Sequence, residues 1–272
     1  GALFVQDKEG NFRSSVQPAF LKDSIPEDTD AVFFDADGDK DPDLFVVSGG
    51  NAFKEGSPEL QNRLYLNDGK GNFTLKQNAV PNVFVNASCI KPADVDGDGD
   101  TDVFVGARVI PGRYPETPNS YLLINDGKGN FSDNTAVLAA GLQQAGMVTD
   151  AVWADLNNDQ QPDLIVVGEW MPVKVFINQK GKLTDQSTTY FSTATNGWWN
   201  RIFAADFDKD VWAYTTPPPG SIDLFDERQA ELFKNSINRL YENTRYAIVL
   251  RFGGNLVESG FSIRGMENYL CD

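Results

Sequence analysis

One nine-residue segment of the chain concentrates five carboxylates between two apolar stretches. It reads Asp35-Ala36-Asp37-Gly38-Asp39-Lys40-Asp41-Pro42-Asp43. The alternate side chains of Asp35, Asp37 and Asp39 can point into one concavity, which Asp43 would close. Carboxylates this close repel one another unless a cation lies between them, and hard oxygen ligands of this kind favour Ca²⁺ over softer metals. The segment therefore predicts a calcium loop; the alternative is an acidic turn exposed to solvent.

The segments on either side of this loop predict strands. Ala31–Phe34 and Leu44–Val47 are short apolar runs rich in β-branched and aromatic residues, which is typical of buried strands. An EF-hand loop also begins with alternating Asp residues, but it joins two helices. It needs Gly at position 6 and Glu at position 12, where this chain has Lys40 and Val46. The sequence thus excludes an EF-hand.

The acidic loop recurs along the chain. Copies begin at residues 35, 94, 155 and 206, at intervals of 59, 61 and 51 residues. The copy at Asp94–Asp102 keeps all five carboxylates, whereas Asp155–Asp163 has Asn157 and Gln161 at two of the positions. The copy at Asp206–Asp210 lacks the closing Asp. Since affinity in such loops follows the number of carboxylates, we expect the first two loops to be filled, the third weaker and the fourth empty or incomplete.

A second signature has the same period. Leu64–Phe73 and Leu122–Phe131 both contain Asn-Asp-Gly between apolar runs, with a second Gly two residues later, which predicts a tight β-hairpin. An earlier copy lies at Phe4–Phe12 and a later one at Val175–Leu183. Each unit is therefore expected to run strand, acidic loop, strand, connection, strand, glycine hairpin, strand.

These units predict an all-β fold of β-propeller blades. Four antiparallel strands that recur every fifty to sixty residues are typical of a blade, whose faces are buried by its neighbours. We expect blades near residues 29–88, 89–147 and 148–199 and the start of another at 200. A β-sandwich is the alternative, but it gives no reason for the loops to recur. The predicted blades make a partial ring, which further blades or self-association would complete.

The repeat stops after Asp210. Pro217–Gly220 indicates a break or linker, a helical pattern with one apolar face follows, and Tyr246–Leu250 is a candidate strand. We therefore divide the chain into blades over residues 1–210 and a C-terminal tail of unknown role over residues 211–272. A helix plus a strand is the candidate structure of this tail.

Composition excludes several classes of function. The net charge is −16 at pH 7, which argues against binding to nucleic acids or anionic membranes, and no apolar run is long enough to span a membrane. The chain has no His, the commonest general base and transition-metal ligand. It opens without Met or a signal peptide, so we interpret it as a processed or trimmed chain. The chain has two cysteines, Cys89 and Cys271. The sequence does not decide between a disulfide bridge and two free thiols.

On these loops and hairpins the chain resembles the FG-GAP or VCBS repeat family, whose calcium-loop blades also occur in integrin α-subunit propellers. Asn67–Phe73, together with Val109–Pro115 and Ser120–Leu123, resembles more narrowly the secreted cartilage-acidic-protein-like branch of the ASPIC/UnbV type. The resemblance covers about residues 1–210. It implies a Ca²⁺-binding propeller, located outside the cell, at the cell surface or in the periplasm, that serves adhesion or recognition of a glycan or protein.

The resemblance also implies the metal ligands. Each of the first two loops would supply four Asp side chains and one main-chain carbonyl, that of Asp41 in the first loop and that of Asp100 in the second. Asn157 and Gln161 depart from the pattern in the third loop. The candidate ligands are Asp35, Asp37, Asp39, Asp41, Asp43, Asp94, Asp96, Asp98, Asp100, Asp102, Asp155, Asn157, Asp159, Gln161 and Asp163.

A candidate ligand-binding face follows from the order of the strands. Successive connections in a meander alternate between faces, so the acidic loops and glycine hairpins should share one face and the longer connections the other. The longer connections supply Arg108, Arg113, Tyr114 and Trp170, which suit stacking on a sugar or anchoring a protein partner. Two alternatives remain open: packing of Trp198 and Trp199 between blades, and bracing of its own loop by Arg113.

The sequence favours a binding module over an enzyme. The acidic clusters are already assigned to metal, and we find no separate carboxylate pair or nucleophile motif. The alternative is a calcium-dependent polysaccharide lyase or hydrolase in which Arg113 or Tyr114 takes part in proton transfer.

Overall fold

The computed structural model describes residues 1–205 and 247–251 of the chain. The chain forms two compact units, Gly1–Asn200 and Arg201–Asp272. In the second unit, β16 (Arg201–Ala205) pairs with β17 (Ala247–Arg251) in antiparallel fashion, which confirms a strand at the position predicted near residue 246. The acidic loop at Asp206, the linker and the predicted helix lie outside the described residues, as does the proposed boundary at 210.

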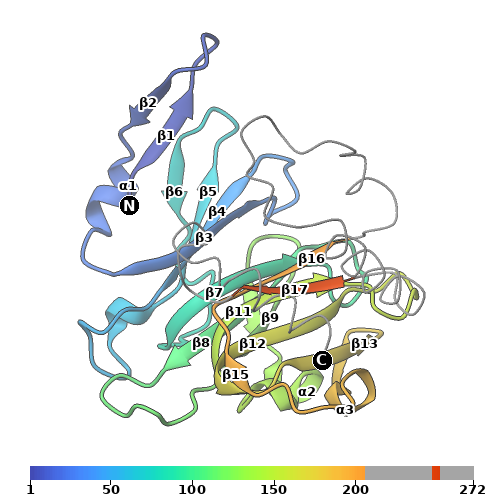
Figure 1. Cartoon of the computed structure of the whole chain (residues 1–272). Helices are drawn as coiled ribbons and strands as arrows, with labels where there is room; N and C mark the ends of the chain where they lie inside the picture. The colour runs from blue at the N-terminus through green and yellow to red at the C-terminus, as the bar shows by residue number, and fades with distance from the viewer. Residues whose placement is uncertain (206–246, 252–272) are drawn as a thin grey trace, which may run out of the picture. The chain divides into compact units, whose positions relative to one another are not determined.

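The first unit contains three four-stranded antiparallel meanders, visible as successive sheets in Figure 1. The first comprises β3 (Asp28–Phe34), β4 (Asp43–Ser48), β5 (Arg63–Asn67) and β6 (Phe73–Leu75). The second comprises β7 (Asn86–Ala93), β8 (Asp102–Val109), β9 (Tyr121–Asn125) and β10 (Phe131–Asp133). The third comprises β11 (Met147–Ala154), β12 (Asp163–Met171), β13 (Lys174–Gln179) and β14 (Lys182–Asp185), and β15 (Gly197–Trp198) pairs with the end of β12. These are the predicted propeller blades, and the described strands do not close a ring.

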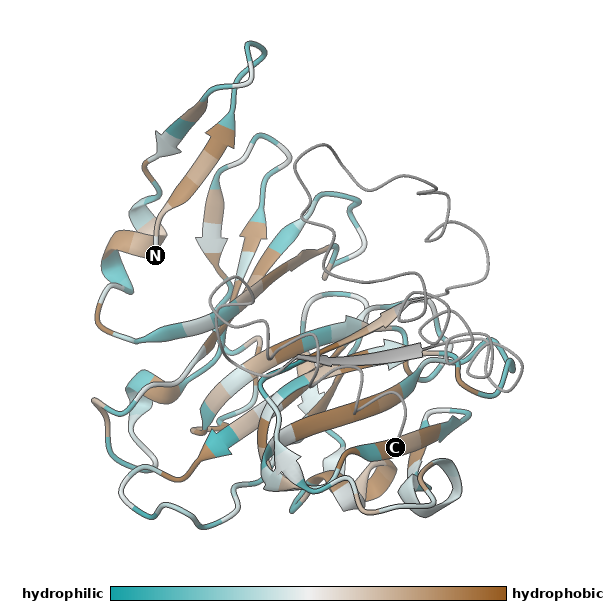
Figure 2. Cartoon of the chain, viewed as in Figure 1, coloured by the Kyte–Doolittle hydropathy of each residue, from teal (hydrophilic) through white to brown (hydrophobic). Residues whose placement is uncertain are grey.

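Neighbouring blades meet along their first strands and bury one another's faces. β7 lies beside both β3 and β11. In β8, Val103 and Val105 join the apolar cluster shared with the first blade, whereas Phe104 between them joins the cluster shared with the third. Side chains that alternate along this one strand therefore pack against two different blades. Figure 2 shows the resulting hydrophobic bands along the middle strands of the blades.

The second strand of each blade is the most deeply buried. β4 is buried along its whole length, as is nearly all of β12, because both faces of these strands are covered. Such strands need apolar residues at consecutive positions rather than in alternation, which is the pattern of Leu44–Val47.

The prediction that Ala31–Phe34 is buried was wrong. In β3, Val32 and Phe34 are partly buried against the cluster shared with the second blade. Ala31 and Phe33 point to the other side, where Phe33 is 51% exposed. The physical reason is that this first strand is covered on one face only.

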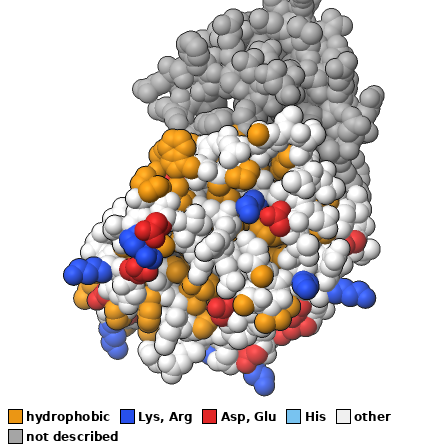
Figure 3. Space-filling view, turned by 90° about the horizontal axis from the view of Figure 1, so that it is seen from below, with side chains coloured by type: hydrophobic (Ala, Val, Ile, Leu, Met, Phe, Trp, Pro, Cys, Tyr) orange, Lys and Arg blue, Asp and Glu red, His pale blue; other side chains and the backbone are white. Residues whose placement is uncertain are grey.

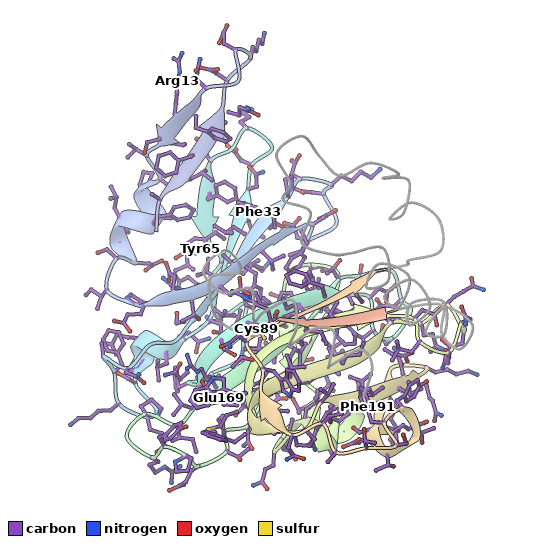
Figure 4. All side chains as sticks on the ribbon, in the orientation of Figure 1. Arg13, Phe33, Tyr65, Cys89, Glu169 and Phe191 are labelled. Atoms are coloured by element: carbon purple, nitrogen blue, oxygen red, sulfur yellow. The ribbon has the colours of Figure 1, made fainter. Side chains whose placement is uncertain are left out.

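The N-terminal segment packs on the outer face of the first blade. It consists of β1 (Leu3–Gln6), β2 (Phe12–Ser15) and the short helix α1 (Pro18–Lys22). The ring of Phe20 meets Tyr65 edge to face at 5.0 Å, and Tyr65, labelled in Figure 4, donates a hydrogen bond to Asp23 Oδ2. This contact fixes the helix on the blade.

The remaining helical elements are single turns in connections. They are α2 (Thr135–Leu138), α3 (Ser187–Tyr190) and the 3₁₀ turns η1 (Pro58–Leu60) and η2 (Ala140–Leu142). The described part of the chain is thus nearly all β. Within it, no helix is long and apolar enough to cross a membrane. Cys89 is a free thiol buried between the second and third blades, where burial raises its pKa to about 12; Cys271 lies outside the described residues.

Replacing Phe104 by Ala tests the interlocking of the blades. Phe104 is fully buried, so Phe104→Ala should lower the free energy of unfolding by about 3–5 kcal/mol through lost burial and the cavity left behind. The matched control is Phe12→Ala, since Phe12 is 68% exposed and should cost less than about 0.5 kcal/mol. Urea unfolding followed by far-UV circular dichroism measures both, and equal effects would contradict the assignment of the core.

Candidate functional site

The first acidic loop is curled around its own carboxylates by backbone hydrogen bonds. Asp35 accepts the amide hydrogens of Gly38 and Lys40, each at 2.8 Å, and Asp39 accepts that of Asp41 at 2.9 Å. Gly38 and Lys40 adopt positive φ angles of 81° and 73°, which lets the chain turn twice within a few residues. The loop at Asp94 repeats the pattern, with Gly97 and Gly99 as donors to the same carboxylate.

Three carboxylates converge in each of the first two loops. In the first loop, oxygen atoms of Asp35, Asp37 and Asp39 lie within 4.8 Å of one another. Within the described part of the chain, the buried Oδ1 of Asp37 has no hydrogen-bond partner. Burial, followed by the charge of Asp39, raises the pKa of Asp37. An unpartnered oxygen among mutually repelling carboxylates fits a hard cation.

The second loop gathers a slightly different set. Here the converging oxygens belong to Asp94, Asp96 and Asp102. The pKa of Asp96 is raised by burial and then by the charge of Asp98, and burial raises the pKa of Asp102 to about 6. These residues therefore fit a cation as the first loop does.

The closing Asp of each loop has a structural role that the spacing alone did not reveal. In the first blade, Asp43 Oδ2 accepts the Ala36 amide at 2.9 Å and Oδ1 accepts the Asn67 amide at 2.8 Å. It thereby ties the start of the loop to the end of the third strand. Asp102 and Asp163 make the equivalent pairs of bonds in the other two blades. We call this arrangement the aspartate clasp.

The third loop satisfies its carboxylate with its own amides. The side-chain amides of Asn157 and Gln161 donate to Asp159 Oδ2 at 3.0 and 3.2 Å. Two backbone amides also point to Asp155. Donors thus occupy positions at which the first two loops present acceptors, and weaker metal binding by this loop stays a prediction.

Two asparagines link the acidic loop of one blade to the hairpin strand of the next. Asn125, at the end of β9, donates its side-chain amide to the carbonyl of Ala36 in the preceding blade at 2.9 Å. Asn178, at the end of β13, does the same to Val95 at 2.8 Å. Both asparagines also donate their main-chain amides to the clasp of their own blade. The loops are therefore joined in series across the blade boundaries.

The opposite face brings three aromatic residues together. Trp170 donates its indole N–H to the Tyr114 hydroxyl at 2.7 Å, and its ring meets Trp198 edge to face at 4.9 Å. All three are substantially exposed. Tyr114 and Trp170, with Glu169, line a hollow of about 620 Å³. Figure 3 views the molecule from the side on which β15 lies in Figure 1 and shows hydrophobic side chains gathered among charged ones.

The two arginines predicted for this face are both engaged in ion pairs. Arg108 Nε donates to Oε1 of the buried Glu169 at 2.7 Å. Arg113 pairs with Glu55 at 2.9 Å and Glu116 at 3.4 Å. Arg113 therefore braces its loop, the alternative that the sequence left open, and neither arginine lines the hollow described above. Of the two tryptophans at 198 and 199, Trp199 is buried and Trp198 is exposed.

Sequence reasoning missed Glu169, the contact of Trp198 with Trp170 and the interblade asparagines. Glu169, labelled in Figure 4, lies inside an apolar strand without a motif around it. Trp198 joins Trp170 only through the pairing of β15 with β12. The interblade asparagines could have been found, because Asn67, Asn125 and Asn178 occupy the same place in successive hairpin signatures.

Comparison with known proteins supports the repeat. A model of the FG-GAP-like repeat matches residues 35–105 and 155–214. No curated protein matches the chain. Eighteen chains of solved structures match. One is from a study of specific recognition of non-reducing terminal N-acetylglucosamine by a lectin of Agrocybe aegerita, with 20% identity and a TM-score of 0.45 over 71% of this chain. This chain spans 47% of that structure. A similarity of this size gives no information about what this chain binds.

Removing an interblade amide should weaken the joint between blades. Asn125→Ala deletes a buried donor and leaves the Ala36 carbonyl unpaired, so the free energy of unfolding should fall by about 1–3 kcal/mol. Asn67→Ala is the matched control, because the Asn67 amide bonds to Pro42 within its own blade at an exposed position. Urea unfolding in calcium-free buffer measures both variants. A loss from Asn67→Ala as large as that from Asn125→Ala would contradict the interblade role.

The raised pKa of Asp102 predicts how the stability of the calcium-free protein depends on pH. The folded pKa of about 6 lies above the unfolded value of 3.8, so the folded state binds more protons between them. The stabilisation is complete below pH 3.8 and is lost as the pH rises through about 6, so unfolding should cost about 1 kcal/mol more at pH 5 than at pH 7. Asp102→Asn should reduce this difference. Urea unfolding of both proteins at the two pH values is the measurement, and a parent that gains stability from pH 5 to 7 would contradict it.

Proposed function

The chain carries FG-GAP-like repeats, and from this premise we propose that it is a calcium-binding recognition module of an extracellular, cell-surface or periplasmic protein. In this proposal the loops at Asp35 and Asp94 bind structural Ca²⁺. The opposite face, which includes Tyr114 and Trp170, binds a protein or glycan.

One observation carries the calcium part of the proposal. The carboxylates of Asp35, Asp37 and Asp39 converge within 4.8 Å, and the buried Asp37 Oδ1 is left without a hydrogen-bond partner among the described residues. Without a cation these charges repel one another in a partly buried loop. Bound Ca²⁺ would neutralise them and hold the loop by oxygen ligands. The aspartate clasp would carry this rigidity into the third strand of the blade.

The recognition part rests on the separation of the two faces. The clasps use the acidic loops and hairpins for structure, whereas the longer connections on the other side present exposed aromatic side chains. Tyr114 comes from a connection of the second blade and Trp170 from the end of β12 in the third, and the two meet through a 2.7 Å hydrogen bond. Exposed aromatics that are held in a fixed arrangement are typical of binding sites.

We weigh an enzymatic role as the second candidate and find less support for it. In the described part of the face, Glu169 is held by Arg108, and Arg113 is held by two glutamates. Each of these charges is thus paired with a charge of opposite sign. A calcium-dependent lyase or hydrolase would need a free acid or base near Tyr114.

Thermal unfolding in calcium and in chelator tests the proposal. A site saturated at about one hundred times its dissociation constant adds about 2.7 kcal/mol, so millimolar Ca²⁺ should raise the Tm of the parent by at least about 5 °C. Asp37→Asn should lose about half of this rise, because it removes a carboxylate from the first loop. Asp159→Asn should keep nearly all of it.

Asp159→Asn is the matched control, since the amides of Asn157 and Gln161 already occupy that carboxylate. Isothermal titration calorimetry of the same proteins should give two calcium ions per parent chain and one per Asp37→Asn chain. A parent whose Tm is the same in calcium and in chelator would show that the loops are acidic turns. A larger loss from Asp159→Asn than from Asp37→Asn would overturn the ranking of the loops.

A further inference from the structure

We propose that the hollow beside Trp170 is a binding site for a neutral pyranose ring of a glycan. This inference deepens the proposed function by naming the ligand class of the recognition face, and it rests on that function. The hollow lies between the connection that carries Tyr114, the turn around Gly146 and the end of β12. Its volume of about 620 Å³ falls within the range of about 300–1,000 Å³ that is usual for small-ligand pockets.

Two aromatic rings in this hollow are exposed and fixed in place. Trp170 is 63% exposed and Tyr114 is 55% exposed, whereas apolar rings of this size are ordinarily buried. The hydrogen bond between the Trp170 indole N–H and the Tyr114 hydroxyl satisfies the polar end of the indole, while most of the side chain stays exposed. Trp198 supports Trp170 from the side, edge to face at 4.9 Å. A fixed, open indole face suits the apolar C–H face of a sugar ring.

The backbone at Trp170 is strained at the point where its ring is exposed. Its φ of 56° lies in the left-handed region, which is uncommon for a residue with a bulky side chain. β12 is buried on both sides of this point, at Glu169 and Met171, while Trp170 between them faces outward. Strained residues of this kind cluster at ligand sites, where the surrounding structure holds them in place.

The polar groups around the rings match hydroxyl groups rather than charges. Thr117 and Gln144 line the hollow and can both donate and accept hydrogen bonds. Glu169 is the one charged residue among the described residues that line it. Both contacts of Arg108 with this carboxylate are made to Oε1, so the pair is neutral overall and Oε2 takes no part in it. Oε2 is an acceptor for a ligand hydroxyl.

The pairing of the charged groups favours a neutral sugar over the other classes of ligand that bind aromatic sites. An anionic sugar or a nucleotide would need a cation in the lining, and the Arg108 guanidinium is taken by Glu169. A quaternary ammonium ligand would gain from an unpaired carboxylate beside the rings, and Glu169 is paired. A hollow of this size with a few polar groups among apolar ones also suits one or two sugar units better than the broad surface that a protein partner requires.

Titration of the whole chain with sugars tests the proposal. The probes are neutral oligosaccharides built from glucose, mannose, galactose and N-acetylhexosamine units, used up to about 10 mM to detect millimolar dissociation constants. Binding is followed by tryptophan fluorescence and by calorimetry in calcium. We expect at least one probe to bind, Trp170→Ala to weaken it at least about tenfold, and Trp170→Phe to stay within about fivefold of the parent.

Phe12→Ala is the matched control, because Phe12 is an exposed aromatic on β2, outside the hollow, and its loss should leave sugar affinity unchanged. Circular dichroism establishes that each variant is folded. Failure of every neutral probe to bind, or sugar binding that Trp170→Ala leaves intact, overturns the inference. So does binding of choline in place of sugars. The melting experiment on the acidic loops is independent of these outcomes, so failure of the sugar site and failure of the calcium sites are distinguishable.

Discussion

The aspartate clasp is the interaction on which the rest of the blade depends. Each buried closing carboxylate, at Asp43, Asp102 and Asp163, accepts one amide from its own loop and one from the end of the third strand. A buried carboxylate must be satisfied by donors or a cation, because its desolvation otherwise costs several kcal/mol. The loop conformation, the register of the third strand and the position of the converging carboxylates all follow from meeting that requirement.

The clasp also explains how similar loops can differ in the surroundings of their carboxylates. It needs only the closing Asp, so the third loop keeps its fold although Asn157 and Gln161 replace carboxylates. Their side-chain amides then donate to Asp159, so hydrogen bonds within the loop stabilise that carboxylate. In the first loop no such donors exist at those positions, and Asp37 Oδ1 remains without a partner among the described residues. One scaffold therefore holds both a loop with an unpartnered carboxylate oxygen and a loop whose carboxylate accepts hydrogen bonds from its own amides.

The interblade asparagines and the aromatic cluster use the two faces of the same repeat differently. Asn125 and Asn178 extend the clasp from blade to blade, so the loop face is a continuous hydrogen-bonded structure. On the other face the connections differ in length and sequence between blades, and only there do Tyr114, Trp170 and Trp198 meet. Rigidity on one face allows variation on the other, since loops tolerate change where the scaffold is fixed.

The sequence by itself determined the repeating blades, because recurrence of the acidic loop and of the Asn-Asp-Gly hairpin is a local pattern that needs no long-range contact. It also determined which loops are rich in carboxylates. Only the tertiary structure decided that Phe33 is exposed, that Arg113 braces its loop and that Glu169 lies beside Trp170. These outcomes depend on which residues from different blades meet, and pairing across blades leaves no periodic signal in a single sequence.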